Sequence, residues 1–138
     1  MPKIFTSKHQ KIGELGEKIA TSFLIKQRFS IIERNYTKPW GEIDIIAKKK
    51  NKIYFIEVKS VTEKPLNKSS PLRRETTHTP EENMHQLKIN RLSRTIRTYL
   101  ADKGMTEESE WQFDLIVIIL NFEKRKAKIK LVKDIILC

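Results

Sequence analysis

The sequence predicts an α/β fold in which a central mixed sheet of five strands is flanked by helices, in the order α-β-β-β-α-β-β. Two segments carry apolar residues at helical spacing, and five shorter segments have the alternating or continuous apolar patterns of strands. The second helical segment separates the first three strands from the last two, which favours one layered domain with helices packed on a sheet. A length of 138 residues suits a single domain, residues 1–138.

The first helix is expected from His9 to about Arg28, because apolar residues recur there every three or four positions. Strands are expected at residues 30–36, 41–48, 52–60, 111–121 and 126–132. The second helix is expected from about Glu81 to Asp102, with Gly104 ending it. Three prolines lie among polar and basic residues at 62–80, which predicts a mobile loop.

The composition points to a polyanionic partner. The chain has 28 Lys and Arg against 17 Asp and Glu, a net charge of +11, which favours nucleic acid or an anionic membrane surface. No apolar run approaches the roughly 20 residues that span a bilayer, and the N-terminus lacks a secretory pattern. The one cysteine, Cys138, excludes an internal disulfide and a cysteine-rich zinc module. A cytoplasmic protein with no membrane partner is therefore expected.

The second and third predicted strands carry the most informative charges. If Lys50-Asn51 is a two-residue turn, Asp44 lies opposite Glu57 and Glu42 lies opposite Lys59. Facing side chains in such a pair have Cβ atoms about 4.5–5.5 Å apart. One face of this hairpin is expected to be wholly apolar, and it comprises Ile43, Ile45, Ala47, Tyr54, Ile56 and Val58.

Two facing carboxylates in a poorly solvated place repel each other, so one must keep a proton or a cation must lie between them. Hard oxygen ligands at this spacing suit Mg²⁺ or Mn²⁺. Lys59 would lie two residues along on the same face, where its ammonium could orient water or stabilise charge on a phosphate. The spacing alone is equally compatible with a solvated strand edge.

At these residues the sequence resembles the PD-(D/E)xK nuclease superfamily, in which an acid on one strand and an acid-x-Lys triplet on the next form a metal-dependent site. Over roughly residues 10 to 120 it is more closely similar to the YraN family. The blocks that carry this resemblance are Gly13-Glu14-Leu15-Gly16-Glu17 with Ala20, Arg34-Asn35-Tyr36, Gly41-Glu42-Ile43-Asp44 and Glu57-Val58-Lys59.

The resemblance implies a restriction-endonuclease-like fold, similar to Holliday-junction resolvases, and an endonuclease that acts on structured or branched DNA, by analogy as a homodimer. It implies that Asp44 and Glu57 bind the metal with the backbone carbonyl of Val58, that Lys59 is the catalytic lysine, and that Glu17 is the acid from the first helix. The sequence departs from the pattern at Ile43, where the superfamily often has Pro, and at Val61, where the family commonly has Arg.

Nucleic-acid contacts are expected from Lys88 and Arg91 on the second helix and from Arg73 and Arg74 in the loop. The family's lysine in the second helix corresponds to Lys88. For the basic residues of the last hairpin, a solvated face is the preferred interpretation. Two alternatives to the enzyme stay open: a non-catalytic nucleic-acid-binding module with the same fold, and a basic scaffold that docks on a protein or ribonucleoprotein.

Overall fold

The computed structural model describes residues 8–63, 86–105 and 108–137. It confirms the predicted α/β fold and element order. Residue 62 ends a strand, two residues beyond the predicted limit. Residues 64–80 of the predicted loop, with Arg73 and Arg74, and the predicted helical residues 81–85 lie outside the described residues. The elements are α1 (Lys8–Lys26), β1 (Ser30–Lys38), β2 (Gly41–Lys49), β3 (Lys52–Thr62), α2 (Gln86–Asp102), β4 (Trp111–Asn121) and β5 (Lys126–Val132).

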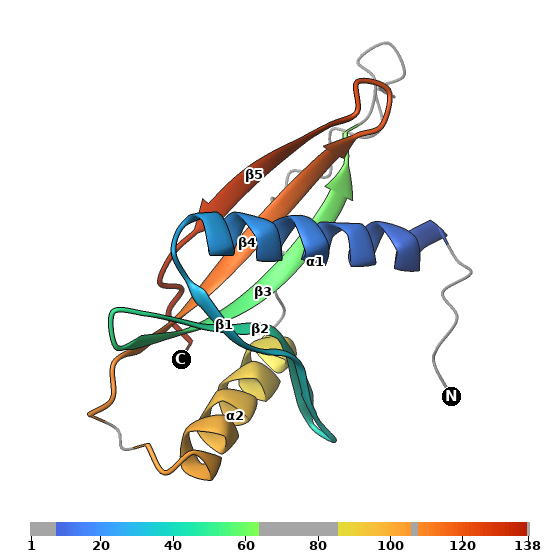
Figure 1. Cartoon of the computed structure of the whole chain (residues 1–138). Coiled ribbons are helices and arrows are strands. Elements are labelled where there is room, and N and C mark those ends of the chain that lie inside the picture. Colours follow the sequence, from blue (N-terminus) through green and yellow to red (C-terminus); the bar gives the residue numbers. More distant parts are fainter. Residues whose placement is uncertain (1–7, 64–85, 106–107, 138) are drawn as a thin grey trace, which may run out of the picture.

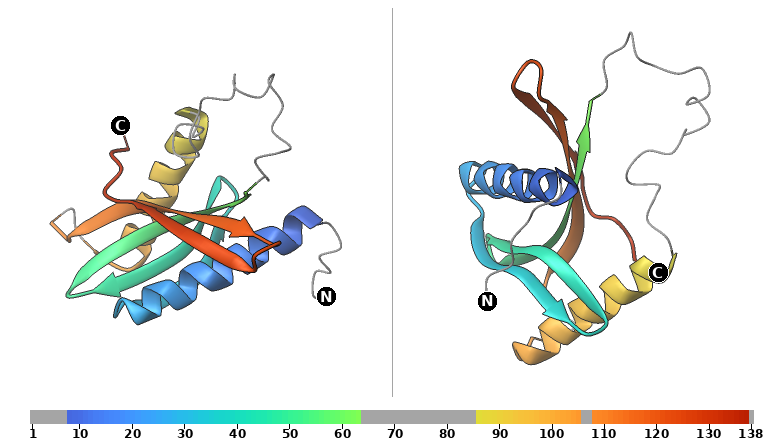
Figure 2. Two further views of the ribbon diagram at one scale, coloured as in Figure 1. Left: turned by 90° about the horizontal axis from the view of Figure 1, so that it is seen from above. Right: turned by 90° about the vertical axis from the view of Figure 1, so that its right-hand side faces the viewer.

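The five strands form one sheet in the order β1-β2-β3-β4-β5. β3 and β4 are parallel and are connected through α2, whereas the other neighbouring pairs are antiparallel. The two helices lie on opposite faces of this mixed sheet (Figures 1 and 2). Neither of these helices is long and apolar enough to cross a membrane, within the residues described.

On the α1 face, the helix packs closest to the sheet through small residues. The apolar stripe expected from the sequence, Ile12, Leu15, Ile19 and Phe23, is not the centre of the contact. Leu15 is 37% exposed, while Gly16, Ala20 and Leu24, each one residue further along, are buried. A Cβ on Gly16 would overlap the side chain of Ser60 in β3, so glycine permits the close approach. The residues Ile45, Ala47, Ile56, Ile116 and Ile118 complete this core.

On the α2 face, the buried core contains aromatic rings. Tyr99 of α2 meets Tyr36 and Phe55 edge to face, with ring centroids 5.3 and 5.5 Å apart. The helix ends where predicted, because Gly104 takes a positive φ of 66° and the Met105 amide bonds back to the helix. Ile43, Ile46, Leu92, Ile96 and Phe113 belong to the same core.

Strand β2 changes faces partway along. Ile45 and Ala47 lie in the α1 core, but Ile43 lies in the α2 core with Ile46, so the predicted single apolar face is wrong at Ile43. Asn35 lies across from Asp44 in the β1–β2 ladder and has a positive φ of 55°, which interrupts strict alternation there. The start of β2 is thereby turned toward α2.

Candidate active site

Strands β2 and β3 separate at the position of the predicted site. The expected register is confirmed from Lys49–Lys52 to Ile45–Ile56, where the ladder ends. Beyond this point residues 41–43 pair with β1, and residues 57–62 pair with β4. Because the ladder ends at Ile45–Ile56, neither of the predicted pairs beyond it, Asp44–Glu57 and Glu42–Lys59, is formed; Glu42 lies opposite Thr37 of β1, and Lys59 lies opposite Val117 of β4. We call the opening between the two strands the fork.

Asp44 is anchored inside the fork. The Val58 amide of β3 donates a hydrogen bond of 2.8 Å to Asp44 Oδ2. Burial and the negative charge of the neighbouring Glu57 together raise the pKa of Asp44 to about 8, against the lowering effect of the Val58 hydrogen bond. The structure therefore brings Asp44 and Glu57 into one electrostatic unit, as the two-carboxylate hypothesis requires.

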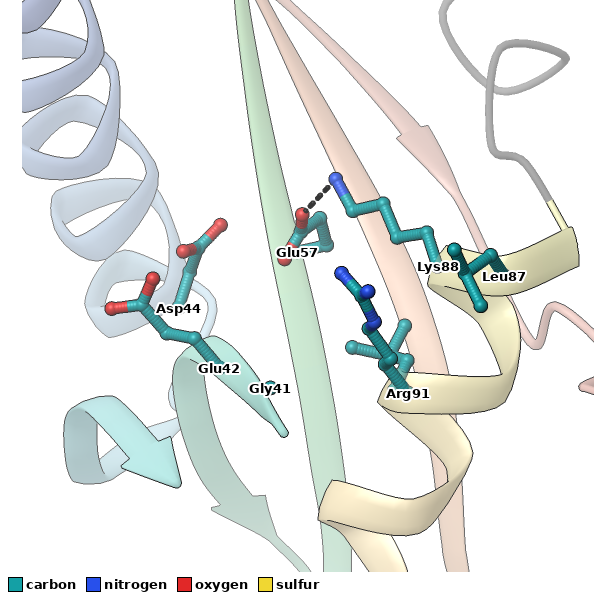
Figure 3. A pocket seen from close by; sticks show the side chains of 8 residues that line it. Gly41, Glu42, Asp44, Glu57, Leu87, Lys88 and Arg91 are labelled. Carbon is teal, nitrogen blue, oxygen red and sulfur yellow. Dashed lines mark ion pairs between the residues drawn. The ribbon is translucent and has the colours of Figure 1, made fainter. Parts of the chain in front are cut away.

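Glu57 faces α2 across a cavity of about 470 Å³. Lys88 Nζ lies 2.7 Å from Glu57 Oε2, and Figure 3 shows its side chain extending from α2 to the carboxylate. Burial acts to lower the pKa of Lys88, but the hydrogen bond and charge of Glu57 outweigh it and raise the pKa. Two of the predicted nucleic-acid contacts thus line the site, because Arg91 borders the same cavity as Asp44 and Glu57.

Glu17 approaches the fork from the α1 side. Burial raises its pKa, the nearby Arg34 opposes this, and the charges of Glu42 and Glu57 raise it again. Arg34 Nη2 of β1 lies 3.5 Å from Glu17 Oε1. Glu17, Arg34 and Glu42 line a neighbouring cavity of about 590 Å³. The first-helix acid is therefore next to the site, with an arginine partner that sequence reasoning did not identify.

A close approach of backbone atoms shapes the cavity on its other side. A Cβ on Gly41 would lie against Thr95 Oγ1 and 3.2 Å from the Arg91 carbonyl oxygen. Glycine therefore lets the start of β2 lie directly on α2, next to Glu42 and Asp44. The Gly41-Glu42-Ile43-Asp44 block contained this signal, but only the packing of α2 shows why glycine is needed there.

Lys59 stands apart from the other predicted site residues. It follows Glu57 by two positions in β3, so both side chains are on the same face of the sheet. Lys59 is nevertheless exposed, and it borders neither the cavity of Asp44 and Glu57 nor that of Glu17. In this structure Lys88 provides the amine inside the cavity.

The donor set at the fork fits a hard divalent cation in part. Asp44 and Glu57 supply carboxylate oxygens, and the Val58 carbonyl faces the same neighbouring strand as its amide, toward Asp44. Among the described residues, no group of three or more His, Cys, Asp or Glu is arranged to hold a metal. Mg²⁺ commonly binds through one or two carboxylates and completes its shell with water and phosphate, so this donor set is compatible with Mg²⁺ or Mn²⁺.

Other polar and aromatic residues near the sheet have structural partners. Tyr36 is buried, and its hydroxyl donates to Asp102. The Arg94 guanidinium lies 4.1 Å from the ring centre of Trp40, so this ring already has a cation on one face. Asp114 is buried and accepts 2.8 Å hydrogen bonds from the Gln112 side chain and the Asp134 amide, which indicates a structural role.

Comparison with known proteins identifies a bacterial family. The model of "Uncharacterised protein family UPF0102" matches residues 16–118. A UPF0102 protein of Clostridium botulinum strain 657 is 34% identical over 126 residues, covering 91% of this chain and 94% of that protein. A UPF0102 protein of Moorella thermoacetica is 34% identical over 128 residues, covering 93% and 97%. A third, from Clostridium acetobutylicum, is 32% identical over 126 residues, covering 91% and 93%.

Proposed function

The chain belongs to the UPF0102 family, which is the YraN family, and we propose that it is a metal-dependent endonuclease of the cytoplasm that hydrolyses DNA phosphodiester bonds. The family description is silent on activity, so the proposal depends on the fork. Branched or otherwise structured DNA is the substrate implied by the resemblance to junction resolvases. Two sites presented by a symmetric dimer would suit such a substrate.

The arrangement of Asp44 is the observation that carries this proposal. A carboxyl group that is buried beside a second carboxylate destabilises the folded protein when both are ionised. Such an arrangement is typical of functional sites, where strain of this kind supports metal binding or proton transfer. The Val58 amide holds one oxygen of Asp44 in place and leaves the other to bind a ligand.

Each side chain at the fork has a role in phosphodiester hydrolysis. A bound Mg²⁺ or Mn²⁺ would polarise a phosphoryl oxygen and lower the pKa of a water molecule. Asp44 and Glu57 would hold this ion with the Val58 carbonyl, and Glu17 would support the site from α1. A positively charged amine, from Lys59 as the resemblance implies or from Lys88 in the cavity, would orient the attacking water and stabilise charge on the phosphate.

A non-catalytic nucleic-acid-binding module is the second candidate function. The ammonium of Lys88 already neutralises Glu57, and Lys59 lies outside the cavity. In this alternative, Lys88 and Glu57 form a structural ion pair that no metal ion replaces, and the basic surface binds DNA without cutting it. Binding would then depend on salt but not on a divalent cation.

Cleavage of labelled linear, flapped and four-way DNA with Mg²⁺ or Mn²⁺ tests the proposal. Asp44→Asn keeps an acceptor for the Val58 amide but removes the charge, so cleavage should fall roughly 100-fold or more, since a catalytic metal supplies several kcal/mol. Glu110→Gln is the matched control, because Glu110 is an exposed carboxylate in the loop before β4. It should cleave like the unmodified protein.

The same assay separates the two amines. Lys59→Ala and Lys88→Ala should differ, and the larger loss identifies the amine that acts on the reacting phosphate. If the unmodified protein binds DNA but cuts none of the three substrates with either cation, the binding module replaces the enzyme. Equal cleavage by Asp44→Asn and by the unmodified protein would show that the fork is not the active site.

A further inference from the structure

Lysines continue from the fork across the sheet on the face of Glu57. Lys59 of β3 pairs with Val117 of β4, and Val117 pairs with Lys130 of β5. Paired residues in neighbouring strands project to the same face. Lys59 and Lys130 therefore flank Val117 on the side of the sheet that carries Glu57, two strand spacings or about 9.5 Å apart.

The alternation of β5 places two more lysines on this face. Lys130 lies opposite Val117, Lys128 opposite Ile119, and Lys126 opposite Asn121. The intervening residues project to the other face, where Leu131 packs in the α1 core. Side chains two residues apart in a strand are about 6.7 Å apart, so three exposed ammonium groups follow one another along β5. We call Lys59, Lys126, Lys128 and Lys130 the lysine track.

The lysine track runs away from the cavity in one direction only. It begins two residues after Glu57 and leads to the β4–β5 turn, which lies at the far end of the sheet from α2 (Figures 1 and 2). Glu63 contributes a negative charge there, 3.5 Å from Lys128 Nζ. The side chain of Lys128 is 74% exposed and that of Glu63 is 40% exposed. Ion pairs this accessible to water contribute little stability, so a phosphate can replace the carboxylate.

We propose that the sugar–phosphate backbone of one nucleic-acid strand lies along the lysine track, from the fork past Lys59 and onto β5. The inference rests on the proposed function only for the position of the reacting phosphate at the fork. Successive lysines at the spacing of alternate strand residues suit successive phosphates of one strand. Contacts of this kind supply affinity that is independent of base sequence and falls with salt. The β5 lysines, which the sequence alone favoured as a solvated face, then have a binding role.

The test measures DNA binding without cleavage. Asp44→Asn protein is titrated, without divalent cations, against a labelled single strand and the matching duplex between about 50 and 200 mM salt. Adding Lys128→Gln and Lys130→Gln should reduce the slope of log affinity against log salt by about 1.4 for the single strand and 1.8 for the duplex. At about 0.1 M salt the affinity should fall roughly tenfold or more.

The control removes the same charge elsewhere. Lys48→Gln with Lys50→Gln changes two exposed lysines at the β2–β3 turn, and it should leave the slope within experimental error. Thermal unfolding of both double variants verifies that each is folded. Equal weakening by the two pairs would mean that only net charge matters and would overturn the track. Unchanged binding by the β5 double variant, or no detectable DNA binding by the Asp44→Asn protein itself, would also overturn it. Loss specific to the β5 pair supports the track even if no DNA is cleaved, so the two proposals can fail separately.

Discussion

The two halves of β2 belong to one strand, but one half stabilises the folded protein and the other half carries a group that destabilises it. Residues 45–48 pair with strands on both sides, and Ile45, Ile46 and Ala47 are completely buried. In the other half, the ladder with β3 has ended, and Asp44 is held by a single amide of that strand. The comparison shows that the site forms where β2 and β3 stop pairing, because the carboxylate of Asp44 is left in a poorly solvated opening between the two strands.

The largest expected effect is in the paired half. Ile46→Ala removes a fully buried side chain from the α2 core and should lower the free energy of unfolding by about 2–5 kcal/mol. Urea unfolding measures this. Ile32→Ala is the control because Ile32 is 42% exposed on β1, and its loss should be much smaller. Similar losses in both variants would show that the paired half does not carry the stability assigned to it.

In the fork half, removing a charge should stabilise the protein. The pKa of Asp44 is about 8 in the folded state and 3.8 as the ordinary value, so the folded state binds this proton more tightly than the unfolded state. The ionised carboxylate therefore costs nothing well below pH 4 and costs progressively more as the pH rises to about 8. Asp44→Asn should raise the free energy of unfolding by up to several kcal/mol at about pH 9 and by much less at about pH 5.

Urea unfolding of both proteins across this pH range checks the prediction in the presence of a chelator. Glu42→Gln is the matched control, because Glu42 is an exposed carboxylate two residues away in the same strand. It should change the stability by no more than about 0.5 kcal/mol at either pH. A gain for Asp44→Asn that is independent of pH would contradict the electrostatic explanation and point to packing instead.

The apolar half of β2 was predictable from sequence because regular alternation and a two-residue turn determine register. The same extrapolation also paired Asp44 with Glu57 and Glu42 with Lys59, beyond the point where the ladder ends; the two carboxylates nevertheless lie close enough to interact. Where a ladder ends depends on what each strand pairs with on its other side, here β1 and β4, and alternation contains no such information. The change of face at Ile43 was unpredictable for a similar reason, since it coincides with the positive φ of Asn35 in another strand.

Charge partners were the other unpredictable part. The resemblance assigned Glu17 to the site, and the structure places it next to the fork, but its ion pair with Arg34 joins α1 to β1. The sequence assigned Lys88 to nucleic acid, whereas the fold directs its ammonium to Glu57. Both pairs depend on how α1 and α2 lie on the sheet, and small residues decide this at Gly16 and Gly41. Periodicity identifies the face of a helix but not its distance from the sheet.

The smallest expected effect concerns the cation at the fork. Lys88→Met removes the ammonium from Glu57, whose side chain is 14% exposed. Because the Lys88 side chain is itself 54% exposed, the loss of stability without divalent cations should be about 1 kcal/mol or less. The shift in melting temperature caused by Mg²⁺ or Mn²⁺ should be larger in this variant, since the ammonium no longer competes with the ion for Glu57.

Lys38→Met provides the comparison for this last measurement. Its ammonium pairs with Asp102 at 3.5 Å at the end of α2, away from Asp44 and Glu57, so the cation-dependent shift should match that of the unmodified protein. If Lys88→Met and Lys38→Met respond equally to the cation, Lys88 does not occupy the position that a metal would take. The ion pair would then be a structural contact between α2 and β3, and the difference between the two halves of β2 would concern stability alone.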